Sequence, residues 1–193
     1  MKELKLIPIE VSARHIHLSE SDFYTLCGKD AKMNFVKALS QPGQFQSDIK
    51  LDIVGPKRSL FGVSVLGPFR KQTQVEISLT DARSVGVKAP IRESGDLKDS
   101  GPIIIKGPYG EISLPEGTIV AMRHVHMTPV DAQYYGVTNG QVVAIEIDSE
   151  GRKTLYGDVV CRVSDTYALA MHIDTDEGNA ANFSSTIGGI LIK

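Results

Sequence analysis

The chain of 193 residues is long enough for one large domain or two small ones. Its 21 basic and 23 acidic residues give a net charge of −2, which argues against the basic surface that nucleic acids and anionic membranes require. The hydrophobic content of 41% is typical of a globular protein, and no apolar run is long enough to span a bilayer. We therefore expect neither a nucleic-acid partner nor a membrane partner.

The first residues, MKELKLIPIEVSARH, lack the basic, apolar and small-residue segments of a secretion signal. The two cysteines, Cys27 and Cys161, are far apart and form no CxxC motif, so we expect both to be buried, reduced thiols. Together these features favour a cytoplasmic protein.

Glycine and proline divide the chain into short pieces, most of which have the composition of β-strands. In chain order, the expected strands are 4–11, 47–55, 59–67, 73–80, 102–107, 117–127, 140–148, 157–163 and 167–174. Two short helices are expected, one capped by Ser19 and running to Cys27, and one that opens at Thr128-Pro129 and runs to Tyr135. This pattern predicts a mainly β protein, built as barrels or sandwiches rather than as a βαβ sheet.

A repeated hexapeptide divides the chain in two. RHIHLS at Arg14–Ser19 recurs as RHVHMT at Arg123–Thr128, 109 residues later, and Asp22 is matched by Asp131. Further similarity follows each copy, as in LFG at 60–62 and LYG at 155–157. The repeat predicts an internal duplication of a small β-rich unit.

Each copy of the repeat carries an HxH motif, His15 and His17 in the first and His124 and His126 in the second. Residues i and i+2 of a strand point to the same face, so each motif places two imidazoles side by side. A single HxH is often only a pair of hydrogen-bonded histidines, but two copies that hold four of the five histidines favour metal binding.

Third ligands are suggested by the repeat itself, because Glu76 and His172 occupy equivalent positions in the two halves. The six groups are too many for one zinc ion with an open position and suit two metal ions. Imidazole-rich sites without thiolates suit zinc, and also iron, copper or nickel. A cupin is the competing interpretation, but cupins place the glutamate within a few residues of a single HxH.

Two candidates for anion binding flank Glu76. Arg70 precedes Glu76 by an even number of residues, so strand periodicity would point both side chains to one side, and its guanidinium fork matches phosphate oxygens. Ser94 lies in the Gly-containing loop 89–96, whose backbone N–H groups could face an anion. Arg14 and Arg123 could face the same anion, but ion pairs of Arg14 with Asp22 and of Arg123 with Asp131 are the favoured interpretation. The acidic segment 174–181 could cap a short helix, accept the second N–H of an imidazole, or bind nothing, and we expect one of its acids to accept from an imidazole.

These segments together resemble the PduL-type phosphate propanoyltransferase (phosphotransacylase) family, and the resemblance extends over nearly the whole chain. It is carried by SARHIHLSESD, PFRKQTQVEISLTDAR, APIRESG, RHVHMTPVDA and LAMHIDTDEGNAA. The resemblance implies two small β-barrels capped by short α-helices, one formed by 14–121 and the other by 1–13 with 122–193, so that the first strand is exchanged. It also implies two zinc ions per chain and a homodimer. The implied reaction is the reversible transfer of a short acyl group (propanoyl or acetyl) between CoA and inorganic phosphate.

Carried across residue by residue, the resemblance implies that His15 and His17 hold the zinc nearer the CoA sulfur. Glu76, His124, His126 and His172 match the ligands of the second zinc. Arg70 matches the phosphate-binding arginine, with the Ser94 loop beside it. Family members housed in bacterial microcompartments carry an N-terminal targeting extension that has no counterpart in the thirteen residues before Arg14, so we expect a cytoplasmic enzyme unless such an extension has been removed.

Direct attack of phosphate on the thioester, without a covalent acyl-enzyme, is the mechanism that we expect. Two other functions fit the same residues. One is a two-metal hydrolase of thioesters or phosphoesters, with water as the nucleophile. The other is a non-catalytic module whose histidines bind metal only to stabilise two small barrels.

Overall fold

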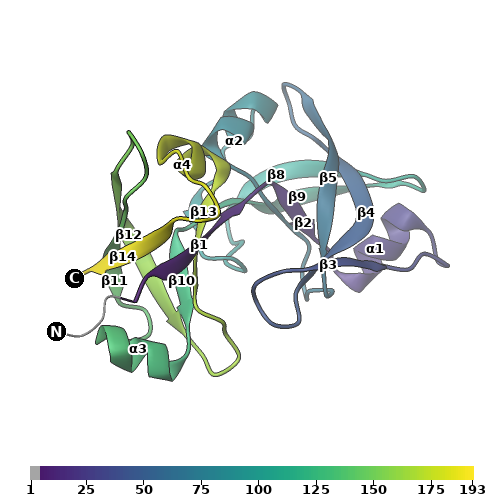
Figure 1. Ribbon diagram of the computed structural model, residues 1–193. Helices are drawn as coiled ribbons and strands as arrows, with labels where there is room; N and C mark the ends of the chain where they lie inside the picture. The colour runs from purple at the N-terminus through teal and green to yellow at the C-terminus, as the bar shows by residue number, and fades with distance from the viewer. Residues whose placement is uncertain (1–4) are drawn as a thin grey trace. The chain divides into compact units, whose positions relative to one another are not determined.

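The computed structural model describes residues 5–193, and Leu4, the first residue of the expected strand 4–11, lies outside this range. Fourteen strands and four short helices occur in the described residues (Figure 1). The strands are β1 (Ile7–Ser12), β2 (His15–His17), β3 (Phe35–Ala38), β4 (Phe45–Val54), β5 (Ser59–Gly67), β6 (Gln74–Glu76), β7 (Ile91–Arg92), β8 (Gly101–Lys106), β9 (Glu111–Ala121), β10 (His124–Met127), β11 (Val142–Ile147), β12 (Thr154–Val163), β13 (Ala170–Asp174) and β14 (Gly188–Ile192). The helices are α1 (Glu20–Cys27), α2 (Leu79–Val85), α3 (Pro129–Tyr135) and α4 (Thr175–Ala180).

The strands form two closed barrels. One has the order β1-β13-β10-β12-β11-β14. The other follows β4-β5-β2-β6-β9 and is closed by β8, which pairs with both β9 and β4. The prediction of a mainly β protein with two barrels and short helices is therefore confirmed.

Both barrels repeat one pairing scheme, which is the structural form of the duplication. The HxH strands β2 and β10 each pair in parallel with one long strand, β5 or β12, and antiparallel with a short strand, β6 or β13. The short strands in turn pair in parallel with β9 and β1. Each of these last two strands precedes an HxH strand in sequence but belongs to the barrel of the other copy, so the first strands of the two copies are exchanged.

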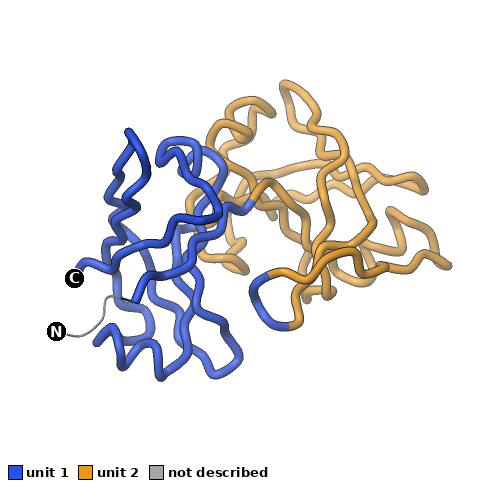
Figure 2. The backbone as a smooth tube through the Cα atoms, in the orientation of Figure 1, with its two compact units in different colours: residues 1–12, 40–42, 122–193 blue, residues 13–39, 43–121 orange. Residues whose placement is uncertain are grey.

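The chain divides into two compact units, which Figure 2 shows in different colours. Unit 1 contains the residues up to Ser12, the loop 40–42 and residues 122–193, and unit 2 contains 13–39 and 43–121. The loop 40–42 lies within the expected segment 14–121 but belongs to unit 1, where the buried amide of Gln41 bonds to the backbone of Ala168.

Each unit has its own apolar core, and the central residue of each HxH motif belongs to it. Ile16 in unit 2 and Val125 in unit 1 are completely buried. The alternation of a strand then sends the two flanking histidines of each motif to the opposite side of the strand. Core packing thus fixes the direction of the imidazoles.

The two helices expected from capping chemistry are confirmed. Ser19 caps α1 and accepts a hydrogen bond from the backbone N–H of Asp22. Thr128 caps α3 in a reciprocal capping box with Asp131, and Pro129 occupies the first turn.

The expected strand 73–80 is only partly correct. Strand β6 ends at Glu76, and Ser78 then caps α2 by accepting a hydrogen bond from the backbone N–H of Asp81. The alternating pattern of 73–80 hides this cap, because serine, leucine and threonine suit a strand as well as a helix start. No helix in the described residues 5–193 has the length and apolar character needed to cross a membrane.

Replacing Thr128 by alanine is expected to lower the free energy of unfolding by about 1 kcal/mol, because the N–H of Asp131 loses its hydrogen-bond acceptor. Urea unfolding of the variant and the parent protein measures this difference. The matched control is Thr138→Ala, at an exposed position, which we expect to stay within ~0.5 kcal/mol of the parent. Equal stability of the two variants would contradict the capping role.

Candidate functional site

The first cluster lies in unit 2 and consists of His15, His17 and Glu76. Antiparallel pairing of β2 and β6 places Glu76 directly opposite His15. All three side chains are buried, and one potential ligand atom from each lies within 4.8 Å of the others. His15 Nε2 is 3.5 Å from Glu76 Oε2. Two nitrogens and one carboxylate oxygen are a common ligand set for zinc that leaves coordination positions open.

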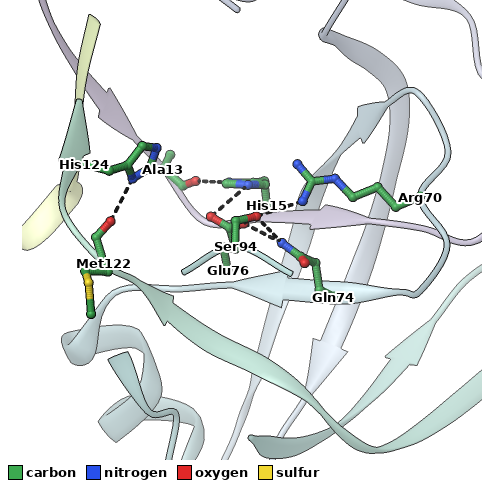
Figure 3. Close-up of polar contacts among 8 residues, drawn as sticks. All are labelled: Ala13, His15, Arg70, Gln74, Glu76, Ser94, Met122 and His124. Carbon is green, nitrogen blue, oxygen red and sulfur yellow. Dashed lines mark hydrogen bonds and ion pairs between the residues drawn. The ribbon is translucent and has the colours of Figure 1, made fainter. Parts of the chain in front are cut away.

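The hydrogen bonds of this cluster leave metal-binding nitrogens available. His15 Nδ1 is 2.8 Å from the carbonyl oxygen of Ala13 (Figure 3), so Nδ1 carries the proton and Nε2 presents its lone pair towards Glu76. His17 Nδ1 is buried and has no hydrogen-bond partner in the structure. A buried nitrogen without a partner is costly, and coordination of a metal ion would satisfy it. The residues present therefore fit a metal ion.

The protonation states of the first cluster also suit a cation. Burial, together with electrostatic repulsion from the neighbouring His15 and Arg70 side chains, holds the pKa of His17 well below its ordinary value, so His17 is neutral. Burial opposes ionisation of Glu76, but the imidazoles, the Ser94 hydroxyl and Arg70 lower its pKa to about 2. Neutral imidazole and ionised carboxylate are the forms that bind metals.

The second cluster lies in unit 1 and consists of His124, His126 and His172. His172 on β13 is directly opposite His124 on β10, as Glu76 is opposite His15. The three ligand nitrogens lie within 4.8 Å of one another. The equivalence of Glu76 and His172 that the sequence repeat predicts is therefore confirmed by strand register.

The histidines of the second HxH motif have the same hydrogen-bonding pattern as those of the first. His124 Nδ1 is 2.8 Å from the carbonyl oxygen of Met122 (Figure 3), and His126 Nδ1 is buried without a hydrogen-bond partner. Burial, with His124 and His172 nearby, lowers the pKa of His126 to about 2. This all-nitrogen set fits a metal ion by the same reasoning.

Two groups of unit 1 adjoin His172. The Glu10 carboxylate on β1 lies 3.8 Å from His172 Nδ1 and accepts a hydrogen bond from Ser40. The amide nitrogen of Gln41 lies 3.4 Å from His172 Nε2. A carboxylate close to one ring nitrogen favours a proton there and leaves the other nitrogen for a ligand bond.

Arg70 and Ser94 adjoin the first cluster, as the sequence predicts, but Arg70 reaches it from a loop and not from the strand of Glu76. The strand-periodicity argument for Arg70 is wrong, because β6 begins at Gln74 and Arg70 lies in the preceding loop. The backbone N–H of Arg70 bonds to the carbonyl of Leu18, and its guanidinium donates to Ser94 Oγ at 2.8 Å. Ser94 Oγ in turn donates to Glu76 Oε1 at 2.7 Å (Figure 3). A fixed positive charge thus lies beside the Glu76 carboxylate.

Glu76 adjoins the first pair of histidines. The resemblance places Glu76 with the second zinc, and in the structure a carboxylate oxygen of Glu76 lies within 4.8 Å of the candidate ligand nitrogens of His15 and His17. The register of β2 and β6 is the reason, because it makes Glu76 the cross-strand neighbour of His15.

The expected ion pairs of Arg14 and Arg123 are also wrong. Arg14 makes a two-pronged pair with Asp81, with both N···O distances at 2.8 Å. Arg123 pairs with Glu177 at 2.5 Å. Both acids lie in the first turn of a helix, α2 or α4, that follows a ligand-bearing strand, so the true partners are equivalent in the two units.

Gln74 was not predicted from the sequence; it is a buried residue on β6 whose amide donates to Glu76 and Ser94. Its position two residues before Glu76, on the same strand face, was the available signal. Of the roles considered for the acidic segment, the structure shows the helix cap, because Asp174 caps α4 and accepts from the N–H of Glu177. The carboxylate that lies 3.8 Å from His172 Nδ1 is Glu10 of β1.

Comparison with known proteins identifies the family. A family model described as phosphate propanoyltransferase matches residues 8–184, which include every residue of both clusters, Arg70 and Ser94. The chain belongs to the phosphate propanoyltransferase family. Members of this family are acyltransferase enzymes.

Curated phosphate propanoyltransferases match over almost their full length. The protein of Alkaliphilus metalliredigens is 49% identical over 187 residues, which are 97% of this chain and 88% of the relative. That of Thermotoga maritima is 48% identical over 175 residues, covering 91% and 83% of the two chains. That of Clostridioides difficile is 45% identical over 193 residues, covering 100% and 92%.

Proposed function

We propose that this chain reversibly transfers a short acyl group, propanoyl or acetyl, between CoA and inorganic phosphate, with one zinc ion at each cluster. The observation that carries the proposal is the pair of three-ligand clusters at equivalent positions of a duplicated barrel, one of them beside the guanidinium of Arg70. Its placement in the phosphate propanoyltransferase family supports the choice of substrates.

The reaction joins a phosphate oxygen to the acyl carbon and breaks the carbon–sulfur bond, so that CoA leaves as a thiolate. When bound, zinc supplies a Lewis acid that favours thiolate and polarises oxygen. His15, His17 and Glu76 would hold one ion, and the three histidines of unit 1 would hold the other. Arg70 supplies the charged fork that binds phosphate and directs its oxygen at the carbonyl carbon.

Direct attack is favoured over a cysteine acyl-enzyme. Cys27 and Cys161 are both buried, and burial raises the pKa of each thiol. A protonated, inaccessible thiol is a poor nucleophile. The expectation that both cysteines are small buried groups is confirmed.

Zinc-loaded protein incubated with propanoyl-CoA is expected to release free thiol only when phosphate is present, and equimolar acyl phosphate should form with it. A thiol reagent follows the first product, and hydroxylamine trapping follows the second. Thiol release without phosphate would indicate the hydrolase, and no release in either case would indicate the metal-stabilised module. Sulfate in place of phosphate is the control for ionic strength.

From the same resemblance we also propose that the protein is a homodimer. We propose that it is located in the cytoplasm, with a bacterial microcompartment as the alternative location. The near-neutral net charge supports the expectation of no nucleic-acid partner.

A further inference from the structure

Gln74 is a buried amide for which the proposed reaction has no role. It lies on β6, where it is only 1% exposed and is directly opposite His17. Because Glu76 follows two residues later on the same strand, both side chains point to the same face (Figure 3). A buried amide must satisfy its two N–H donors, and its partners indicate what it does.

The partners of Gln74 are the ligand carboxylate and the serine beside it. Gln74 Nε2 donates to Glu76 Oε1 at 2.5 Å and to Ser94 Oγ at 2.8 Å. Ser94 Oγ donates its own proton to Glu76 Oε1 at 2.7 Å. This arrangement uses both amide hydrogens and gives Oε1 two donors.

The two oxygens of Glu76 are therefore not equivalent. Oε1 receives two hydrogen bonds, whereas Oε2 lies 3.5 Å from His15 Nε2, inside the cluster. A carboxylate free to rotate could bind a metal through either oxygen or both. With Oε1 held, only Oε2 is directed towards the ligand nitrogens.

We propose that Gln74 is a positioning residue that, together with Ser94, holds Oε1 of Glu76 and presents Oε2 as a single ligand oxygen to the first metal ion. The inference rests on the metal ions of the proposed function. It gives Ser94 a second task besides its contact with Arg70, because one hydroxyl joins the guanidinium to the ligand carboxylate.

The second unit provides an internal comparison. The residue opposite His126 on β13, in the place of Gln74, is Ala170, which is also 1% exposed. The third ligand of that unit is His172, whose ring has only one nitrogen left once the other carries a proton. A neutral imidazole has a single lone-pair nitrogen and needs no donor to select one of two ligand atoms. An amide at this strand position is found only in the unit whose third candidate ligand is a carboxylate.

The test is a zinc titration of the full chain against a chromophoric chelator. Gln74→Met keeps the size of the side chain and removes both donors. In a His124→Ala background, which leaves the first cluster intact, Gln74→Met is expected to weaken zinc binding about 10–100-fold. In a His15→Ala background, which leaves the second cluster intact, the same substitution should not change the affinity. Gln46→Met, at a half-buried position of β4 in the same unit, is the matched control.

Cobalt substitution gives an independent readout. The visible absorption of cobalt in the His124→Ala background should change with Gln74→Met, because a released Glu76 can coordinate through both oxygens. Should Gln74→Met fail to fold, Gln74→Leu also removes both donors without adding a charge, and we expect it to weaken the first site in the same way.

Equal zinc affinity of folded Gln74 variants and parent in the His124→Ala background would overturn this inference while the proposed metal ions remain. Equal weakening in both backgrounds would also overturn it, since that result indicates a general structural role. Failure of the parent protein to bind zinc would overturn the metal proposal and this inference together.

Discussion

His124→Ala and His172→Ala are each expected to reduce acyl transfer by more than ~100-fold, since a catalytic metal ion contributes several kcal/mol to transition-state stabilisation. Each substitution leaves two imidazoles in a cluster of three and should release one of two zinc ions per chain. Elemental analysis of protein that has not been exposed to chelator measures the metal, and the thiol assay measures turnover. Folding should persist, because each unit retains its own apolar core.

All five histidines belong to the two clusters, so the control must be another residue type. The control is Thr138→Ala, at an exposed position, for which we expect normal zinc content and normal activity. His15→Ala is expected to impair mainly the step at the CoA sulfur, with loss of the other zinc ion. Full activity and two zinc ions in His15→Ala or His172→Ala would remove that cluster from the site.

The histidine pairs were predictable because their geometry is local. A period of two along a strand places His15 beside His17, and an apolar central residue indicates which face is the core. The third candidate ligands, Glu76 and His172, could be predicted only because the repeat supplied two sequences to compare. Their confirmed cross-strand positions show that a duplication carries long-range information that one copy lacks.

The errors concern partners that only the folded register brings together. Arg14 pairs with Asp81, 67 residues away, and no local pattern separates that acid from Asp22. The same holds for Gln74, whose polar neighbours arrive from a loop near residue 94. Capping predictions succeeded at Thr128 because the cap, the proline and the acid lie within four residues.

Replacing Arg70 by alanine is expected to lower kcat/KM about 30–1,000-fold, which corresponds to ~2–4 kcal/mol for a charge-assisted, two-pronged contact with phosphate in a partly dry site. Arg70 is half-buried, and its guanidinium is held by Ser94 beside the ligand carboxylate. Arg70→Lys keeps the charge and loses the fork, so it should retain part of the activity with a raised KM for phosphate. Separate measurement of KM for phosphate and for propanoyl-CoA tests this role.

The matched control is Arg83→Ala, an exposed arginine of α2 in the same unit. We expect it to change stability by less than ~1 kcal/mol and to leave phosphate kinetics unchanged. Both Arg70 variants should keep two zinc ions, because arginine does not ligate the metal. A loss in Arg70→Ala confined to KM for propanoyl-CoA would assign the guanidinium to CoA instead. Unchanged kinetics for both substrates in folded, zinc-replete Arg70→Ala would show that its charge serves only to hold Ser94 and Glu76.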